Sequence, residues 1–159
     1  MSWLNSLPAD HAERVFRSCH GAPAWAAAMT HGRPYPSAAT VLEAAERSAA
    51  ALTRDDWLAA FDAHPRIGAR GGLSTQSQRE QAGAGSAPET VLAALAEANA
   101  EYERRFGFVF LICASGLDAE RMLAALRERL DNDPATEWAT ALGEHGKITA
   151  LRLGKLVVG

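Results

Sequence analysis

The 159-residue chain has few cysteines and no long apolar run. Cys19 and Cys113 are far apart in sequence and lie among apolar neighbours, which is typical of buried thiols in a reducing compartment rather than of a disulfide framework. The longest apolar run, Phe108 to Ala114, is far shorter than the roughly 20 residues of a membrane helix. The first residues also lack the basic stretch and apolar region of a secretion signal. We therefore expect a cytoplasmic protein with no membrane partner.

Positive charge is not in excess either. The chain has 16 Lys and Arg against 19 Asp and Glu, a net charge of −3, so it lacks the basic field that attracts a phosphate backbone. This balance disfavours nucleic acid as a partner. A small polar or anionic metabolite stays compatible with it, because a single arginine can bind an anion.

The motifs of several cofactor sites are absent from the sequence. The five histidines show no i, i+4 pair and the two cysteines have no metal-ligand spacing, so we expect no metal site. No glycine-rich motif matches a phosphate-binding or dinucleotide-binding loop, and no nucleophile elbow is present. The remaining chemistry is cofactor-free proton transfer on a small molecule, or no chemistry.

Helix-forming residues dominate the sequence. Ala, Leu, Glu and Arg are abundant, β-branched residues rarely cluster, and no alternating pattern persists long enough to predict a sheet. We predict an all-α fold, a single compact domain of about eight helices over residues 1–159. The expected helices begin near Pro8, Trp25, Ser37, Thr53, Ser74 or Thr75, Pro88, Asp118 and Pro134.

A histidine and a carboxylate flank one short glycine-rich loop. His64 shares a helix face with Trp57 and Phe61, and the proline that follows it should end that helix. Beyond the loop, Ser77, Glu80 and Gln81 have the i, i+3, i+4 spacing of one helix face. An imidazole near neutrality can give or take a proton, and a neighbouring carboxylate would fix its tautomer and raise its basicity. The pair alone is weak evidence, because His64 can equally be a turn residue and Glu80 a solvated one.

Two further features suggest ligand binding. The run Phe108 to Ala114 has neither helical nor alternating periodicity, so we expect a buried extended segment whose backbone groups need partners, although a buried strand fits the pattern too. Arg152 lies between two leucines of the last helix, where a guanidinium can grip a carboxylate. A surface arginine, or an ion pair with Glu144, is the structural alternative.

The combination of these motifs resembles the 2-oxo-4-hydroxy-4-carboxy-5-ureidoimidazoline (OHCU) decarboxylase family of urate degradation over nearly the full length. Tyr35 is a mild departure, since family members usually carry Phe at this position. The matching residues are Leu4-Asn5, Trp25, Arg33-Pro34, Trp57-Leu58, Ala60-Phe61, His64 to Gly68, Ser77, Glu80-Gln81, Phe106-Gly107-Phe108, Phe110, Arg129-Leu130, Asn132, Glu137, Ile148 and Arg152-Leu153.

The resemblance implies decarboxylation of OHCU to (S)-allantoin and CO2 without a cofactor. It implies that His64 is the acid/base residue, that Glu80 lies beside it, and that Arg152 serves the catalytic site. It also favours a homodimer, in which apolar residues at both ends of the chain (Trp3, Leu4 and Leu156 to Val158) either serve the interface or complete the core. The implied substrate-binding residues are Pro65, Ser77, Gln78, Arg79, Glu80, Gln81, Phe110, Leu111, Ile112, Cys113 and Ala114.

Two alternatives stay open on the sequence alone. One is a noncatalytic helical ligand-binding or interaction module, against which the presence of both His64 and Glu80 argues. The other is an enzyme of a neighbouring step in purine or ureide breakdown, such as a ring-opening hydrolysis. The product of the reaction would distinguish them.

Overall fold

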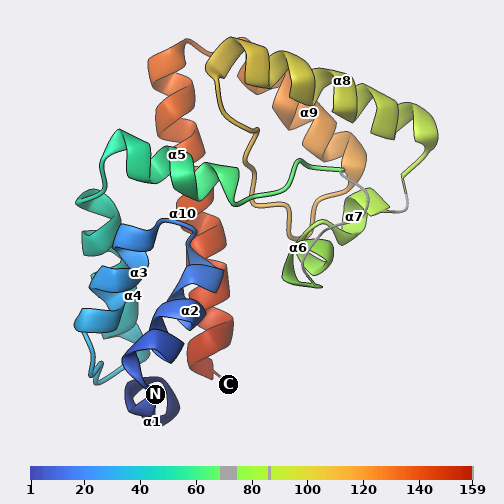
Figure 1. The fold of residues 1–159 in the computed structure, drawn as a ribbon. Helices are drawn as coiled ribbons and strands as arrows, with labels where there is room; N and C mark the ends of the chain where they lie inside the picture. Colours follow the sequence, from blue (N-terminus) through green and yellow to red (C-terminus); the bar gives the residue numbers. More distant parts are fainter. Residues whose placement is uncertain (69–74, 86, 159) are drawn as a thin grey trace. The chain divides into compact units, whose positions relative to one another are not determined.

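The computed structural model describes residues 1–68, 75–85 and 87–158, which contain ten helices and no strand (Figure 1). The predicted all-α class is therefore confirmed. The helices are α1 Ser2–Ser6, α2 Ala9–Cys19, α3 Pro23–His31, α4 Ala38–Ala50, α5 Arg54–Asp62, α6 Thr75–Glu80, α7 Ala82–Gly85, α8 Glu89–Phe106, α9 Ala119–Leu130 and α10 Pro134–Val158.

The helices group into two compact units, which we describe separately. The first unit comprises Met1–Ala63 together with Gly146–Gly159, and the second comprises His64–His145. The long helix α10 contributes residues to both. That residues 1–159 form one domain stays a prediction.

The core of the first unit is built around Trp25. This residue is fully buried, its Nε1 donates to the Ala45 carbonyl at 3.0 Å, and its ring stacks on buried His20 with centroids 4.8 Å apart. Helix α2 packs on α3, and α3 on α4. Tyr35 is buried as well, and its hydroxyl donates to the Met29 carbonyl at 2.7 Å, so the residue that departs from the family pattern has a satisfied polar group.

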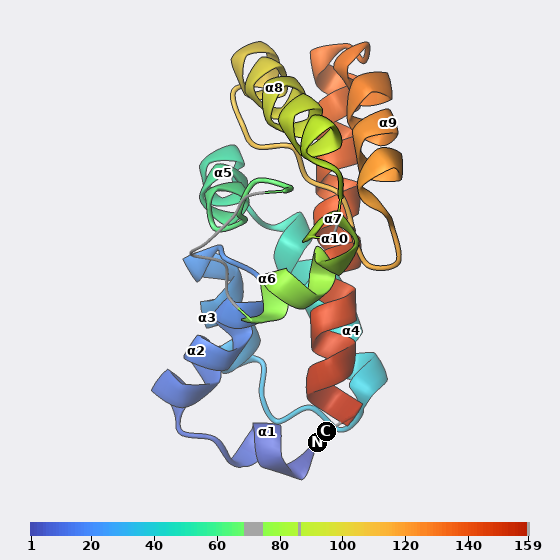
Figure 2. The same cartoon turned by 90° about the vertical axis from the view of Figure 1, so that its right-hand side faces the viewer.

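In the second unit α8 and α9 lie side by side, as both ribbon views show (Figures 1 and 2). Gly107 ends α8 in the left-handed conformation (φ 82°), which glycine adopts without steric cost. The chain then runs without regular structure to α9, and this stretch includes the apolar run Phe108 to Ala114. All of that run except half-buried Cys113 is buried. The predicted buried extended segment is confirmed, and the alternative of a strand is wrong.

Helices α4, α5 and α9 each begin at a residue whose side chain caps the helix. Ser37 at α4 and Thr53 at α5 both form capping boxes, with Thr40 and Asp56 respectively. Asp118 accepts a hydrogen bond from the Arg121 N–H at the start of α9. The first amides of a helix have no intrahelical partner, and these side chains accept hydrogen bonds from them. Because the capping residue is local, the sequence predicts these helix starts well.

The expected number of helices needs correction. The described residues form ten helices rather than about eight, since α1 is additional and α7 is separate from α6. Gly83 lies within α7 and therefore in a helix of its own after the one that contains Glu80. On α4 the buried residues are Val41, Ala44 and Ala45, whereas Leu42 is 38% exposed, because the next position along a helix points about 100° away. The predicted cap Ser74 lies outside the described residues.

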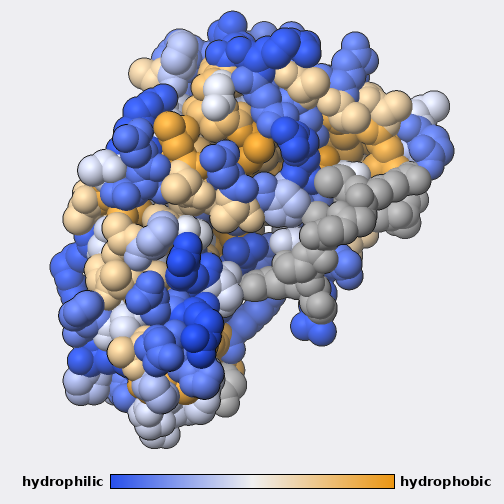
Figure 3. Space-filling view, viewed as in Figure 1, coloured by the Kyte–Doolittle hydropathy of each residue, from blue (hydrophilic) through white to orange (hydrophobic). Residues whose placement is uncertain are grey.

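Hydrophilic and apolar residues are interspersed on the face drawn in Figure 3. Leu4, one of the residues considered for an interface, is only 1% exposed and completes the first unit's core instead. Trp3 and Val158 are 51% and 87% exposed. No helix in the described ranges is both long and apolar enough to cross a membrane.

Candidate active site

His64 lies in a turn directly after α5 and belongs to the second unit. Helix α5 ends at Asp62, two residues before the end predicted from the following proline, so His64 and Pro65 are both half-buried turn residues. The His64 ring meets the ring of His145, from α10, edge to face with centroids 4.9 Å apart. His145 is 1% exposed and therefore forms a packed wall on one side of His64.

Side chains from other helices hold the backbone that follows His64. Buried Asn99, on α8, donates from Nδ2 to the Ile67 carbonyl at 3.1 Å. Arg66 places its guanidinium on both carboxylate oxygens of Glu103, also on α8, at 2.8 and 2.7 Å. The turn that carries His64 is thus tied to α8 at two successive residues.

A third contact joins the turn that carries His64 to the residue that follows α6. The Gly68 N–H donates to Gln81 Oε1 at 3.0 Å, and Gln81 is itself buried directly after α6. The predicted common face of α6 is confirmed by burial, because Ser77 and Gln81 are buried and Glu80 is half-buried. The structure therefore brings the chain beside His64 to the end of the helix that carries Glu80. The proposed contact between His64 and Glu80 stays a prediction.

Gln78 and Arg79 lie on the other side of α6. Both are exposed, whereas their neighbours in the motif are not. Their predicted part in substrate binding has no support from burial and stays a prediction.

Helix α7, which follows the α6 block, packs against the backbone just beyond the extended segment. A Cβ at Gly83 would lie 2.0 Å from the Leu117 carbonyl oxygen, so α7 approaches this backbone more closely than any side chain would permit. Leu117 follows the segment by three residues, and its N–H donates to the Ala114 carbonyl at 3.0 Å. The two stretches predicted to line the substrate pocket, Ser77–Gln81 and Phe110–Ala114, are thereby held on neighbouring elements.

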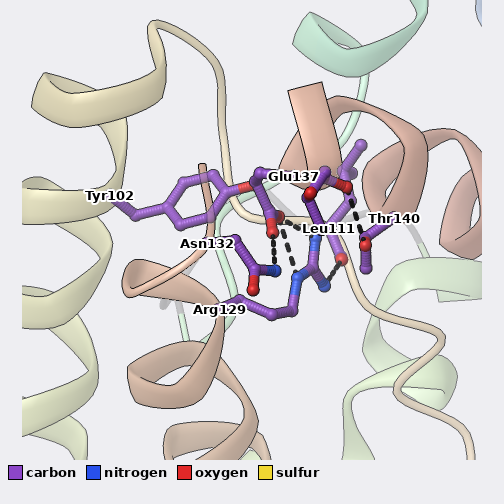
Figure 4. Close-up of polar contacts among 7 residues, drawn as sticks. Tyr102, Leu111, Arg129, Asn132, Glu137 and Thr140 are labelled. Atoms are coloured by element: carbon purple, nitrogen blue, oxygen red, sulfur yellow. Dashed lines mark hydrogen bonds and ion pairs between the residues drawn. The ribbon is translucent and has the colours of Figure 1, made fainter. Parts of the chain in front are cut away.

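A buried polar cluster holds the middle of the extended segment (Figure 4). Arg129 on α9 donates from Nε to Glu137 Oε1 at 2.8 Å and from Nη1 to the Leu111 carbonyl at 2.5 Å. Tyr102 donates its hydroxyl to Glu137 Oε1, and Asn132 donates to Oε2 at 3.0 Å. Burial, together with the hydrogen bond to the Glu137 carboxylate, raises the pKa of Tyr102 well above its usual value.

Arg152 lies in the first unit. It is half-buried on α10, and its Nη1 donates to the Ser18 carbonyl at 3.2 Å. Its predicted catalytic role therefore stays a proposal.

Sequence reasoning did not assign site roles to Asn99, His145 or the Arg129–Glu137 pair. The available signal was a polar residue within an apolar helical stripe, because such a residue needs a buried partner. Among the described residues, no three His, Cys, Asp or Glu side chains gather closely enough to hold a metal ion.

Comparison with known proteins gives one consistent result. The OHCU decarboxylase family model matches residues 5–154. The uric acid degradation bifunctional protein TTL of Arabidopsis thaliana is 37% identical over 155 residues, which cover 91% of this chain but only 47% of that protein. The 2-oxo-4-hydroxy-4-carboxy-5-ureidoimidazoline decarboxylase of Amia calva is 32% identical, and the match covers 99% of this chain and 94% of that one. A crystal structure of OHCU decarboxylase in the presence of (S)-allantoin superposes with a TM-score of 0.81 at 34% identity, covering 91% of this chain and 97% of the other.

Proposed function

The chain belongs to the OHCU decarboxylase family, and from this premise we propose that its active site lies around His64, Glu80 and the extended segment Phe110–Ala114. The chain is a decarboxylase of urate degradation whose substrate is a small ureidoimidazoline. The observation that supports this site most strongly is the 3.0 Å hydrogen bond from Gly68 to Gln81, because it links the His64 turn to the helix of Glu80.

The chemistry of the substrate explains why we propose no cofactor. The carboxylate that leaves is attached to a ring carbon next to a C=N bond. When the bond to CO2 breaks, its electron pair can move into that imine, which acts as the electron sink. The protein then has to hold the carboxylate out of the ring plane, stabilise the electron-rich intermediate and deliver a proton to one face of the carbon.

In our proposal His64 transfers this proton. Its turn is fixed by the backbone contacts of Asn99 and Gln81, and His145 packs against its ring, so the imidazole is held in place before substrate arrives. Glu80 orients and charges the imidazole. Delivery of the proton from one side only would give (S)-allantoin rather than the racemate.

The remaining predicted residues bind the polar parts of the substrate. Buried Ser77 and Gln81, half-buried Pro65 and Arg152, and the backbone of Phe110–Ala114 would hydrogen-bond or contact the polar ring and the ureido group. A homodimer and a cytoplasmic location complete the proposal, and exposed Trp3 and Val158 are available for an interface.

Steady-state kinetics on freshly generated OHCU tests these roles. Loss of positioned acid/base catalysis should lower kcat by roughly 10²- to 10⁴-fold in His64→Gln, with a smaller loss in Glu80→Gln. Arg152→Ala should raise KM.

His11→Gln, Glu97→Gln and Arg17→Ala are matched controls at exposed helical positions. If His64→Gln and His11→Gln turned over alike, the assignment of His64 would be wrong, and unchanged kcat and KM in Arg152→Ala would remove Arg152 from the site.

A further inference from the structure

A single buried guanidinium contacts two successive residues of the proposed substrate wall. Besides its hydrogen bond to the Leu111 carbonyl, Arg129 places Cζ 4.6 Å from the centre of the Phe110 ring. Tyr102 packs on the same segment, edge to face with Phe108 and Phe110 at centroid distances of 5.8 and 5.4 Å. The side chains that bind Glu137 therefore also hold the wall, as Figure 4 shows for Leu111.

Glu137 fixes the orientation of this guanidinium. It is fully buried, and its carboxylate accepts hydrogen bonds from Tyr102, Arg129 and Asn132. A buried carboxylate with several donors cannot rotate without losing charge-assisted hydrogen bonds in a low-dielectric interior. The orientation of Arg129, and with it the position of the Leu111 carbonyl, is consequently set.

The direction of one carbonyl sets the direction of the next amide. The described residues contain a single cis peptide, between Arg33 and Pro34, so the peptide between Leu111 and Ile112 is trans. In a planar trans peptide the C=O and the following N–H point in opposite directions. With the Leu111 carbonyl turned to Arg129, the Ile112 N–H points away from Arg129.

We propose that Arg129, oriented by Glu137, is a positioning residue for the reaction: by holding the Leu111 carbonyl it presents the Ile112 amide as a hydrogen-bond donor to an oxygen of the substrate. This inference rests on the proposed function, since it assigns substrate to the Phe110–Ala114 wall. It goes further in giving the buried ion pair a role in substrate recognition beyond that of joining α9 to α10.

Arg129→Lys tests the proposal, because lysine keeps the charge but cannot hold Glu137 and the Leu111 carbonyl with one planar fork. Val41→Ala is the control for destabilisation, since Val41 is fully buried in the first unit and lies outside the cluster. We expect Arg129→Lys to raise KM by on the order of tenfold to a hundredfold at a temperature where the variant is folded, and to shift the amide NMR signals of residues 110–114. Val41→Ala should lower Tm without either effect.

A purely structural role predicts a different result. Arg129→Lys would then lower Tm as Val41→Ala does, with kcat and KM near those of the wild type, and that result would overturn the proposal. If Arg129→Lys does not fold, Tyr102→Phe replaces it, because it removes one donor to Glu137 and keeps the ring. We then expect KM to rise about fivefold, the equivalent of one hydrogen bond, and an unchanged KM would be equally decisive. A wild-type protein without turnover would contradict the proposed function instead, while the NMR comparison would still test the positioning of the segment.

Discussion

Cys19 is a residue whose ionisation is linked to folding. It is 3% exposed in the first unit's core, and burial raises the pKa of its thiol from 9.0 to about 11, with smaller opposing effects from Ser18 and Arg152. The folded state therefore favours the neutral thiol. Its contribution to stability is complete below pH 9 and is lost as the pH rises from 9 towards 11.

The predicted loss is measurable by urea unfolding at pH 7.5, 9 and 10.5. Two pKa units correspond to about 2–3 kcal/mol of unfolding free energy at the alkaline limit. Burial also raises the pKa values of Tyr35 and Tyr102, so the wild type should lose stability for more than one reason. Cys19→Ala should have a flatter profile than the wild type, and parallel profiles for the two proteins would contradict the assignment.

Residue-level chemistry was also the part of the site that the sequence predicted least completely. His64 could be proposed from the sequence because a histidine followed by a proline and a glycine-rich loop is a local pattern. Asn99, His145 and Arg129 act through residues far away in sequence, at Ile67, His64 and Leu111. Their roles depend on how helices pack, which one chain's periodicity does not encode.

At the scale of the element, Gly83 is the position where backbone packing leaves no room for a side chain. Alanine is normally favoured over glycine inside a helix by up to about 1 kcal/mol. At Gly83 the new Cβ would lie 2.0 Å from the Leu117 carbonyl oxygen, and a backbone atom cannot move aside cheaply. We expect Gly83→Ala to lower the free energy of unfolding by about 1–3 kcal/mol.

Gly143→Ala on α10 is the matched control, because a Cβ there would meet nothing within 4 Å. It should stabilise the protein by about 0.5–1 kcal/mol. Thermal and urea unfolding of the two variants compare them directly. If Gly83→Ala stabilised the protein to the same extent, the close approach of α7 to the Leu117 backbone would be wrong.

Helix boundaries show why some elements were predictable. The starts of α4, α5 and α9 were predicted correctly, because Ser37, Thr53 and Asp118 each accept a hydrogen bond from an N–H three residues later. The signal for each start therefore lies within four consecutive residues. Helix α1 was missed because its five residues carry no side-chain cap. The extended segment was located by its apolar composition, but the cluster that satisfies its Leu111 carbonyl comes from α8, α9 and α10.

At the scale of the whole molecule, the all-α class follows from composition and the activity follows from family membership. The sequence motifs predicted which blocks of the chain form the site, and that assignment stays a proposal. The structure adds the contacts that link those blocks within the second unit: Gly68 to Gln81, Ile67 to Asn99 and Leu111 to Arg129. Such links join separate elements, so they could not be predicted from local patterns.

Every proposed role depends on stereospecific decarboxylation of OHCU by this chain, with His64 as the proton-transfer residue. Circular dichroism of freshly generated substrate measures this reaction, with wild-type protein, His64→Ala or no protein in the cuvette. We expect a fast optical signal of (S)-allantoin from the wild type alone. Racemic product formed at the uncatalysed rate in all three samples would rule out catalysis by this chain and favour a noncatalytic binding protein.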